Sequence, residues 1–244
     1  MPMSDLSTHL RVAHGITPVQ SNLRQLVYGG NDGIVTTFAI VAGFAGAGAE
    51  GAAQLGALAV LLFGLANLFA DATAMGLGEF LSSRSERDVY RATRAREMHL
   101  IHTDPEAEYA EVLALLERRG LSRADAAQFA DQLCRHPELL GDFMMAYEYS
   151  MAGGDDDDGI RNGLFTFFSF LVFGTVPLLP YFLMEPNDLA FRLSVLGTAS
   201  ALFALGVLRW AATREAMLRC VAETMAVGGT CALVAYLVGW IIGG

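Results

Sequence analysis

The sequence predicts an all-α, polytopic membrane protein with five transmembrane helices and a helical, water-facing domain inserted between helices 2 and 3. Hydrophobic residues make up 53% of the 244 residues, and the mean hydropathy is +0.40, which is too apolar for one soluble domain. Charge is also uneven, since residues 33–70 hold one acidic and no basic residue, whereas 82–160 hold seventeen acidic residues and nine arginines. The chain therefore has two kinds of surroundings, lipid and water.

Five apolar stretches are long enough to cross about 30 Å of hydrocarbon. They lie near residues 33–48, 55–81, 164–184, 189–210 and 221–242, and the first needs its polar start, from about Leu23, to reach that length. Pro177 and Pro180 remove two backbone donors, so we expect the third span to kink or break there. The resulting domains are an N-terminal segment 1–22, transmembrane helices 1 and 2 at 23–81, an acidic helical domain at 82–160, and transmembrane helices 3 to 5 at 161–244.

Arginine, which supplies all 16 basic residues, predicts the orientation of these spans. Fifteen of the sixteen fall on one side of the membrane if the N-terminus is cytoplasmic, and only Arg192 lies near the other face. Because arginine-rich loops stay in the cytoplasm, we expect the N-terminus and the 82–160 domain there. An odd number of spans then places the C-terminus outside.

The 82–160 segment carries helix punctuation and no strand signals. Pro105 can open a helix that Gly120 ends, Ser122 can cap the next, and Pro137 can begin another. This pattern predicts a small helical bundle. The net charge of -10 argues against nucleic acid as a partner, because phosphate binding needs a basic surface. Small cations are the more natural ligands.

A polar ladder crosses the second apolar stretch. Asn67, Asp71, Met75 and Glu79 stand four residues apart, so they climb one helix face over roughly 18 Å. An ionised group at membrane depth costs about 3 kcal/mol, so these carboxylates, and Asp32 in the first span, must face protein, water or a cation. Their oxygens and one thioether suit a divalent first-row metal such as Fe²⁺. From the residues alone, hydrogen bonding between helices is an equally good interpretation.

Two segments, "LRQLVYGGNDGIVTTFAIVAGFAGAG" and "DATAMGLGEFLSSRSERD", resemble the vacuolar iron transporter family. The likeness covers nearly the whole chain and includes "FGTVPLLPY" and "VGGTCALVAYLVGW". It implies a bacterial member of that family: a five-helix homodimer of the inner (plasma) membrane that exports Fe²⁺, and Mn²⁺, from the cytoplasm in exchange for protons. The ion is then the transported substrate, and no cofactor is expected.

The resemblance also implies a transport pathway along the first two helices. Asp32, Met75 and Glu79 match the family pattern. Asn67 stands where many members have a glutamate, and Asp71 stands one turn later where a small residue is usual. We therefore expect Asp71 to replace the charge that is missing at Asn67.

A metal site in the cytoplasmic domain is implied in the same way. Five residues match the family pattern: Glu97, Glu108, Glu111, Met144 and Glu148. Leu100 and Met145 stand where glutamates are expected, so the cluster should bind fewer ions or bind them more weakly. His99 and His102 are close in sequence to Glu97 and could supply the missing ligands, although we expect them to be exposed histidines on a polar helix.

Two other functions stay open at this point. A membrane ferroxidase would need Glu-x-x-His pairs on facing helices, and no such pair starts at any of the four glutamates above. A metal sensor or scaffold that does not transport is compatible with the absent carboxylates at Asn67 and Leu100. Since the sequence has no HExxH motif, nucleophile elbow or phosphate loop, we expect a transporter rather than an enzyme.

Overall fold

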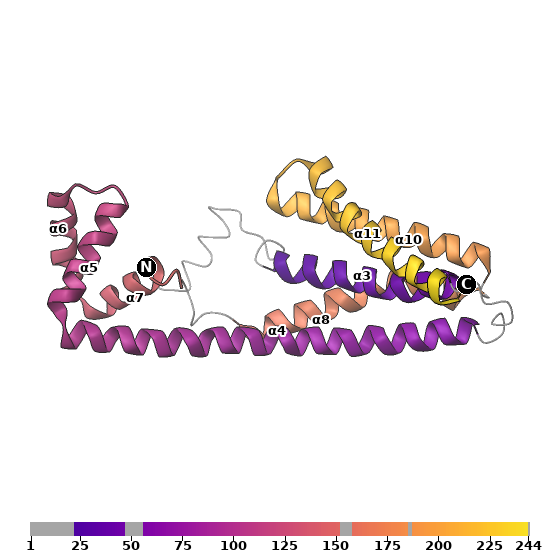
Figure 1. Cartoon of the computed structure of the whole chain (residues 1–244), viewed down its shortest axis with the longest axis horizontal. Helices are drawn as coiled ribbons and strands as arrows, with labels where there is room; N and C mark the ends of the chain where they lie inside the picture. Colours follow the sequence, from indigo (N-terminus) through magenta and orange to yellow (C-terminus); the bar gives the residue numbers. More distant parts are fainter. Residues whose placement is uncertain (1–21, 47–55, 152–157, 185–186, 244) are drawn as a thin grey trace, which may run out of the picture. The chain divides into compact units, whose positions relative to one another are not determined.

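The computed structural model describes residues 22–46, 56–151, 158–184 and 187–243 (Figure 1). All regular structure within these ranges is helical, which confirms the predicted all-α class. The elements are α3 (Leu23–Gly46), α4 (Gly56–Thr103), α5 (Pro105–Arg118), α6 (Arg123–Leu133), α7 (Pro137–Tyr147), α8 (Gly159–Thr175), the 3₁₀ helix η1 (Val176–Leu178), α9 (Leu179–Leu183), α10 (Asp188–Thr213) and α11 (Met217–Gly243). Except for Asn22, the predicted N-terminal segment 1–22 lies outside the described residues.

The chain divides into two compact units. The first consists of Met1–Phe80 and Ile160–Gly244, and the second of Leu81–Gly159. Helix α4 is one continuous helix that contributes to both units. It continues beyond the predicted second span because no glycine or proline stands between Leu81 and Thr103 to end it.

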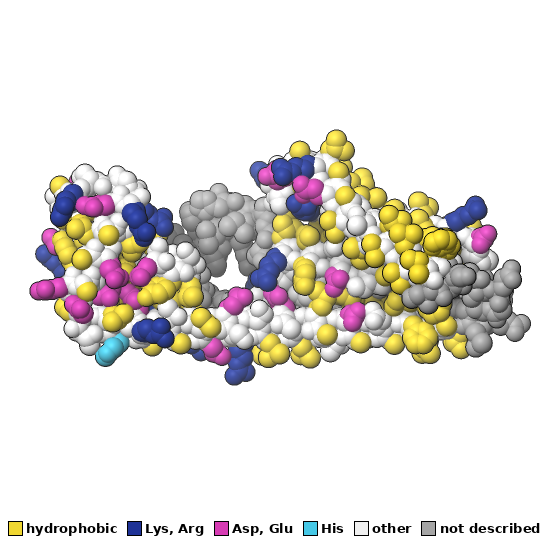
Figure 2. All heavy atoms as spheres, viewed as in Figure 1, with side chains coloured by type: hydrophobic (Ala, Val, Ile, Leu, Met, Phe, Trp, Pro, Cys, Tyr) yellow, Lys and Arg dark blue, Asp and Glu magenta, His cyan; other side chains and the backbone are white. Residues whose placement is uncertain are grey.

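Four helical segments of the described chain are long and apolar enough to cross a membrane. They are Leu58–Thr103, Gly159–Leu183, Asp188–Thr213 and Met217–Ile241. Large apolar side chains such as Leu62 and Ile241 are mostly exposed, and Figure 2 shows hydrophobic side chains spread over α11. So much exposed apolar surface is typical of lipid contact. The structure is therefore that of a multi-pass membrane protein.

Helix α3, the first predicted span, is not among these four segments. It is long enough at 24 residues, but Asn31 and Asp32 lie inside it and lower its hydropathy. The fifth span stays a prediction.

The predicted break in the third span is confirmed. Helix α8 ends at Thr175, the 3₁₀ helix η1 follows, and α9 begins at Leu179. Pro177 lies within η1 and Pro180 in the first turn of α9, where the missing N–H groups cannot continue the α-helical ladder. The Ser194 hydroxyl on α10 donates a hydrogen bond of 2.7 Å to the Pro177 carbonyl oxygen. A side chain of a neighbouring helix thus satisfies a backbone group at the break.

Glycines bring α3 and α8 into backbone contact. A Cβ atom on Gly174 would lie 2.8 Å from the Gly33 carbonyl oxygen, and one on Gly33 would collide with the Phe170 carbonyl. The Ser169 hydroxyl on α8 also donates a hydrogen bond of 2.8 Å to the Leu26 carbonyl oxygen on α3. Small residues permit this close approach. It holds α3 in a fixed position and, with it, Asp32.

The second unit is a small bundle with the predicted helix starts. Pro105 opens α5, Ser122 caps α6 by accepting the Asp125 N–H at 3.2 Å, and Pro137 opens α7. Apolar side chains from its helices form the core, which includes Ile101, Val112, Leu115, Ala130 and Leu140. Arg94 of α4 pairs with Glu138 at 2.7 Å and Asp142 at 3.0 Å on α7. These ion pairs join α4 to α7 within the unit.

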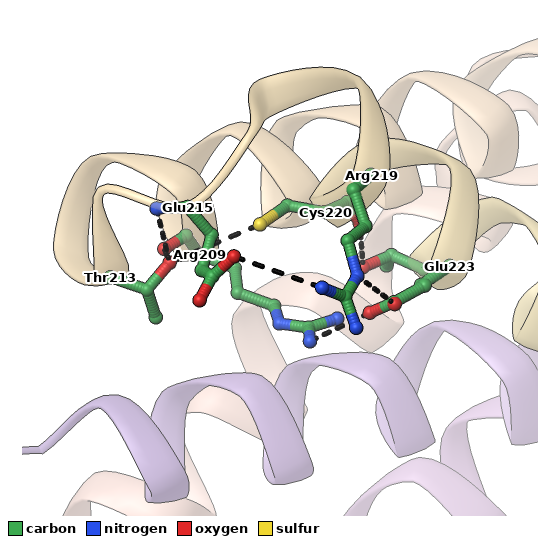
Figure 3. A network of polar contacts seen from close by, with 7 residues as sticks. Arg209, Thr213, Glu215, Arg219, Cys220 and Glu223 are labelled. Carbon is green, nitrogen blue, oxygen red and sulfur yellow. Dashed lines mark hydrogen bonds and ion pairs between the residues drawn. The ribbon is translucent and has the colours of Figure 1, made fainter.

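A network of ion pairs holds the turn between α10 and α11 (Figure 3). The Glu223 carboxylate on α11 pairs with Arg209 on α10 at 2.8 Å and with Arg219 on its own helix at 2.9 Å. Arg219 also lies 3.9 Å from Glu215 in the turn. Glu223 therefore links the two helices across the turn, whereas Glu215 does not.

Glu223→Gln is expected to lower the thermal stability of the full chain in detergent. The variant loses charge in two exposed ion pairs, which contribute little individually, so the unfolding midpoint should fall by only roughly 2–4 °C. Glu215→Gln is the matched control, since it removes only the long contact to Arg219, and its midpoint should not change. Equal midpoints for the two variants would contradict the linking role of Glu223.

Candidate functional site

The polar ladder lies at the border of the buried face of α4. Asn67, Asp71, Met75 and Glu79 are all half-buried. The neighbouring stripe of this helix is fully buried, at Val60, Gly64, Leu68, Ala72 and Gly76. The four side chains are thus neither in the core nor fully exposed. Part of each is accessible from outside the first unit.

Asp71 is the centre of a polar group shared by α4 and α3. The Asn67 amide Nδ2 donates a hydrogen bond of 2.6 Å to Asp71 Oδ2 one turn away. Across the helix interface, Asp71 lies close enough to Asp32 for the two carboxylates to repel each other. A cation or a proton at this position would relieve the repulsion. The structure therefore brings Asp32, Asn67 and Asp71 together.

Glu79 lies at the other end of the ladder and is held by the first turn of α3. The Gln25 amide Nε2 donates a hydrogen bond of 3.1 Å to Glu79 Oε1, and Arg24 Nη2 lies 3.8 Å from Glu79 Oε2. Gln25 and Arg24 were not predicted from the sequence, although they lie in the polar start of the first span.

Met75 lies between Asp71 and Glu79 but contacts apolar neighbours. Its side chain packs against the hydrophobic cluster that contains Leu68, Ala72 and Phe170. Met75 therefore takes part in the apolar packing of the first unit. Its half-buried position still leaves the side chain at the edge of that cluster.

In the second unit, two glutamates of the predicted metal site are almost completely buried. Glu97 on α4 is 1% exposed and Glu108 on α5 is 4% exposed. The Tyr149 hydroxyl donates a hydrogen bond of 3.0 Å to Glu97 Oε2. Glu97 Oε1 and Glu108 Oε2 are buried without a hydrogen-bond partner in the described part of the chain. Tyr149 was not predicted from the sequence.

The pKa values of this cluster reflect buried, like charges. Burial first, and then the neighbouring Glu97 carboxylate, raise the pKa of Glu108 to about 7. Burial and the carboxylates of Glu97 and Glu111 raise the pKa of Glu148. Burial and the hydrogen bond to Glu97 raise the pKa of Tyr149 to about 12. Negative charge is therefore concentrated in this cluster, and the nearby positive charge is too small to balance it.

The predicted ligands of this cluster are nevertheless not all in one place. Glu111 and Glu148 are exposed, whereas Met144 is fully buried in the apolar core of the unit. Acidic side chains gather on this unit in Figure 2. Within the described ranges, no three His, Cys, Asp or Glu side chains are arranged to hold a metal ion. His99 and His102 are exposed.

Comparison with known proteins relates most of this chain to one family. The family model described as "VIT family" matches residues 23–240. The chain belongs to the VIT family. It is 36% identical over 235 residues to the vacuolar iron transporter of Toxoplasma gondii, covering 90% of this chain and 74% of the relative.

Two plant relatives are similar to this chain over comparable lengths. The vacuolar iron transporter 1 of Oryza sativa is 32% identical over 214 residues, covering 88% of this chain and 82% of that protein. The protein of the same name from Arabidopsis thaliana is 30% identical over 220 residues, covering 90% and 86%. These relatives are named as transporters, which fits a VIT family member that is not an enzyme. They come from plants and an apicomplexan, so the bacterial origin stays a prediction.

Proposed function

We propose that this VIT family member exports Fe²⁺ and Mn²⁺ from the cytoplasm in exchange for protons. The feature that carries the proposal is the polar group of Asp32, Asn67 and Asp71 on two adjacent helices of the first unit, in which Asn67 donates a hydrogen bond of 2.6 Å to Asp71 and the charge of Asp71 repels that of Asp32. Two carboxylates that repel each other at membrane depth favour a bound cation or proton. The relatives named vacuolar iron transporters support a metal ion as the substrate.

The proposed pathway follows the ladder of α4 and the facing side of α3. Asp32 and Asp71 bind the ion or a proton, and Asn67, Met75 and Glu79 supply further oxygen and sulfur ligands. A bound divalent ion lowers the proton affinity of a carboxylate, and a proton in turn displaces the ion. Exchange of one for the other needs no covalent step.

The half-buried ladder favours a homodimer as the working unit. Asp71 and Glu79 stand at the border of the buried face of α4, where lipid would otherwise face their carboxylates at a cost of several kcal/mol. A second copy that covers this border would shield the ladder on both sides. We therefore place the ion pathway between two protomers.

The proposed topology has five spans in the inner membrane, with α3 as the first. Helix α3 packs against α10 and α11, both long enough to span a membrane. The distribution of arginine favours a cytoplasmic N-terminus, a cytoplasmic 82–160 domain and an external C-terminus. Reporter fusions at the two ends test this topology, and two ends on the same side would exclude it.

The cytoplasmic cluster is proposed to collect ions before transport. Glu97 and Glu108 provide two buried carboxylates with unpaired oxygens, and Glu111 and Glu148 are near enough to interact with them electrostatically. We propose that ion binding draws these two exposed carboxylates towards the buried pair. The absence of glutamates at Leu100 and Met145 makes this binding weak.

Transport by purified protein in lipid vesicles tests the function. With an acidic interior and Mn²⁺ or Fe²⁺ outside, we expect ion uptake that stops when a protonophore removes the gradient. Empty vesicles control for leakage. Binding of the ion without uptake would instead support the sensor or scaffold, and oxidation of Fe²⁺ by the protein would support the ferroxidase.

A further inference from the structure

We propose that Gln25 is a ligand of the transported cation, and that together with Glu79 it forms one binding station of the pathway. The inference rests on the proposed function. Neither the sequence pattern nor the resemblance to the family assigns a role to this residue.

The Gln25 side chain is buried and only half satisfied. It is 7% exposed, and its Nε2 donates to Glu79 Oε1 at 3.1 Å. Its other polar atom, Oε1, is buried without a hydrogen-bond partner among the described residues. Buried side-chain oxygens rarely remain without a partner, and each exception needs an explanation. Here the exception is the amide oxygen of Gln25, whose amide nitrogen donates to the Glu79 carboxylate.

A glutamine amide can serve a carboxylate in two ways. Without a cation, its NH₂ group donates to the carboxylate, as it does here. With a divalent ion on Glu79, the NH₂ group would meet like charge, and rotation about the last side-chain torsion would present Oε1 instead. Carboxylate and amide oxygens are suitable ligands for Mn²⁺ and Mg²⁺-like hard cations, and they also bind Fe²⁺. Gln25 would therefore change from a donor to Glu79 into a ligand of the ion.

The neighbouring positive charge does not prevent this change. Arg24 lies 3.8 Å from Glu79 Oε2, and its side chain is 72% exposed. Such an exposed ion pair is weak, so the Arg24 side chain can move into solvent when a cation binds Glu79. Glu79, at 11% side-chain exposure, stays in place. A neutral amide also adds an oxygen ligand without adding charge, which lets the ion leave again.

Two substitutions of Gln25 separate the ligand role from the donor role. Gln25→Leu removes both polar atoms and should raise the KM for Mn²⁺ about tenfold, a typical loss for a supporting group at a metal site, and should weaken Mn²⁺ binding equally. Gln25→Glu keeps an oxygen but loses the donor. A ligand role therefore predicts that Gln25→Glu binds Mn²⁺ at least as tightly as the parent.

The experiment uses the full chain, with Mn²⁺ flux in vesicles and equilibrium Mn²⁺ binding by electron paramagnetic resonance in detergent. Gln128→Leu, an exposed glutamine of the second unit, is the matched control and should leave both unchanged. Thermal unfolding confirms that each variant is folded.

Two results would overturn the ligand role. One is a Gln25→Leu variant with unchanged binding and KM, and the other is a Gln25→Glu variant that binds as weakly as Gln25→Leu, since Gln25 would then only hold Glu79. If the parent itself shows no flux, the proposed function fails, while the binding measurement still decides the role of Gln25.

Discussion

Asp71→Asn is expected to reduce Fe²⁺ and Mn²⁺ flux by at least about 100-fold, the upper end of losses for supporting groups at metal sites. Asparagine has nearly the same shape, and its amide oxygen can still accept the hydrogen bond from Asn67 that Asp71 accepts at 2.6 Å. What it lacks is the negative charge that repels Asp32. The substitution therefore tests the charge and leaves the packing intact. Flux is measured in vesicles at ion levels below saturation.

Asp32→Asn should impair flux as severely, because the two carboxylates act on the same position. Asp188→Asn is the control, since Asp188 is an exposed residue in the first turn of α10, and its flux should equal that of the parent. The double change Asn67→Glu with Asp71→Gly moves the charge back by one turn and should preserve flux. Parental flux in Asp71→Asn would show that this carboxylate serves structure only.

The helix starts could be predicted because they depend on local chemistry. Pro105, Ser122 and Pro137 each act on their own turn, and the structure places helix starts at all three. The break at Pro177 follows from the same local rule. The length of α4 was harder to predict, because the composition changes from apolar to charged near Ser82 without any residue that ends a helix. Helix α4 stays helical where its side chains change from apolar to charged, so composition alone does not mark its end.

The candidate site could be predicted only in part, because its partners come from distant segments. The four-residue spacing of α4 was enough to align Asp71 and Glu79 on one face. The bonds from Gln25 to Glu79 and from Tyr149 to Glu97 join residues 54 and 52 positions apart. Their formation depends on how the helices pack, which no local pattern encodes. Polar residues at the ends of apolar stretches are the signal that would have suggested Gln25.

Glu108→Gln is expected to stabilise the second unit at pH 8 and to have little effect near pH 4.5. Burial and the adjacent Glu97 raise the pKa of Glu108 from its ordinary value of 4.5 to about 7. Between these two values the folded state keeps a proton that the unfolded state has released. The free energy of unfolding therefore falls as the pH rises from 4.5 to 7, and the full penalty persists above pH 7.

A glutamine at position 108 stays neutral and removes this pH dependence. The expected gain at pH 8 is at most about 3 kcal/mol, from the size of the pKa shift. Hydrogen exchange of the α5 amides in the full chain measures it, after correction for the intrinsic exchange rate at each pH. Glu111→Gln, at an exposed position on the same helix, should change the opening free energy little. If the Glu108→Gln variant kept the pH dependence of the parent, the dependence could not come from the raised pKa of Glu108. A gain in stability on losing this carboxylate would mean that the buried negative charge of Glu108 destabilises the folded unit. This is expected for a group whose counter-charge is a bound cation.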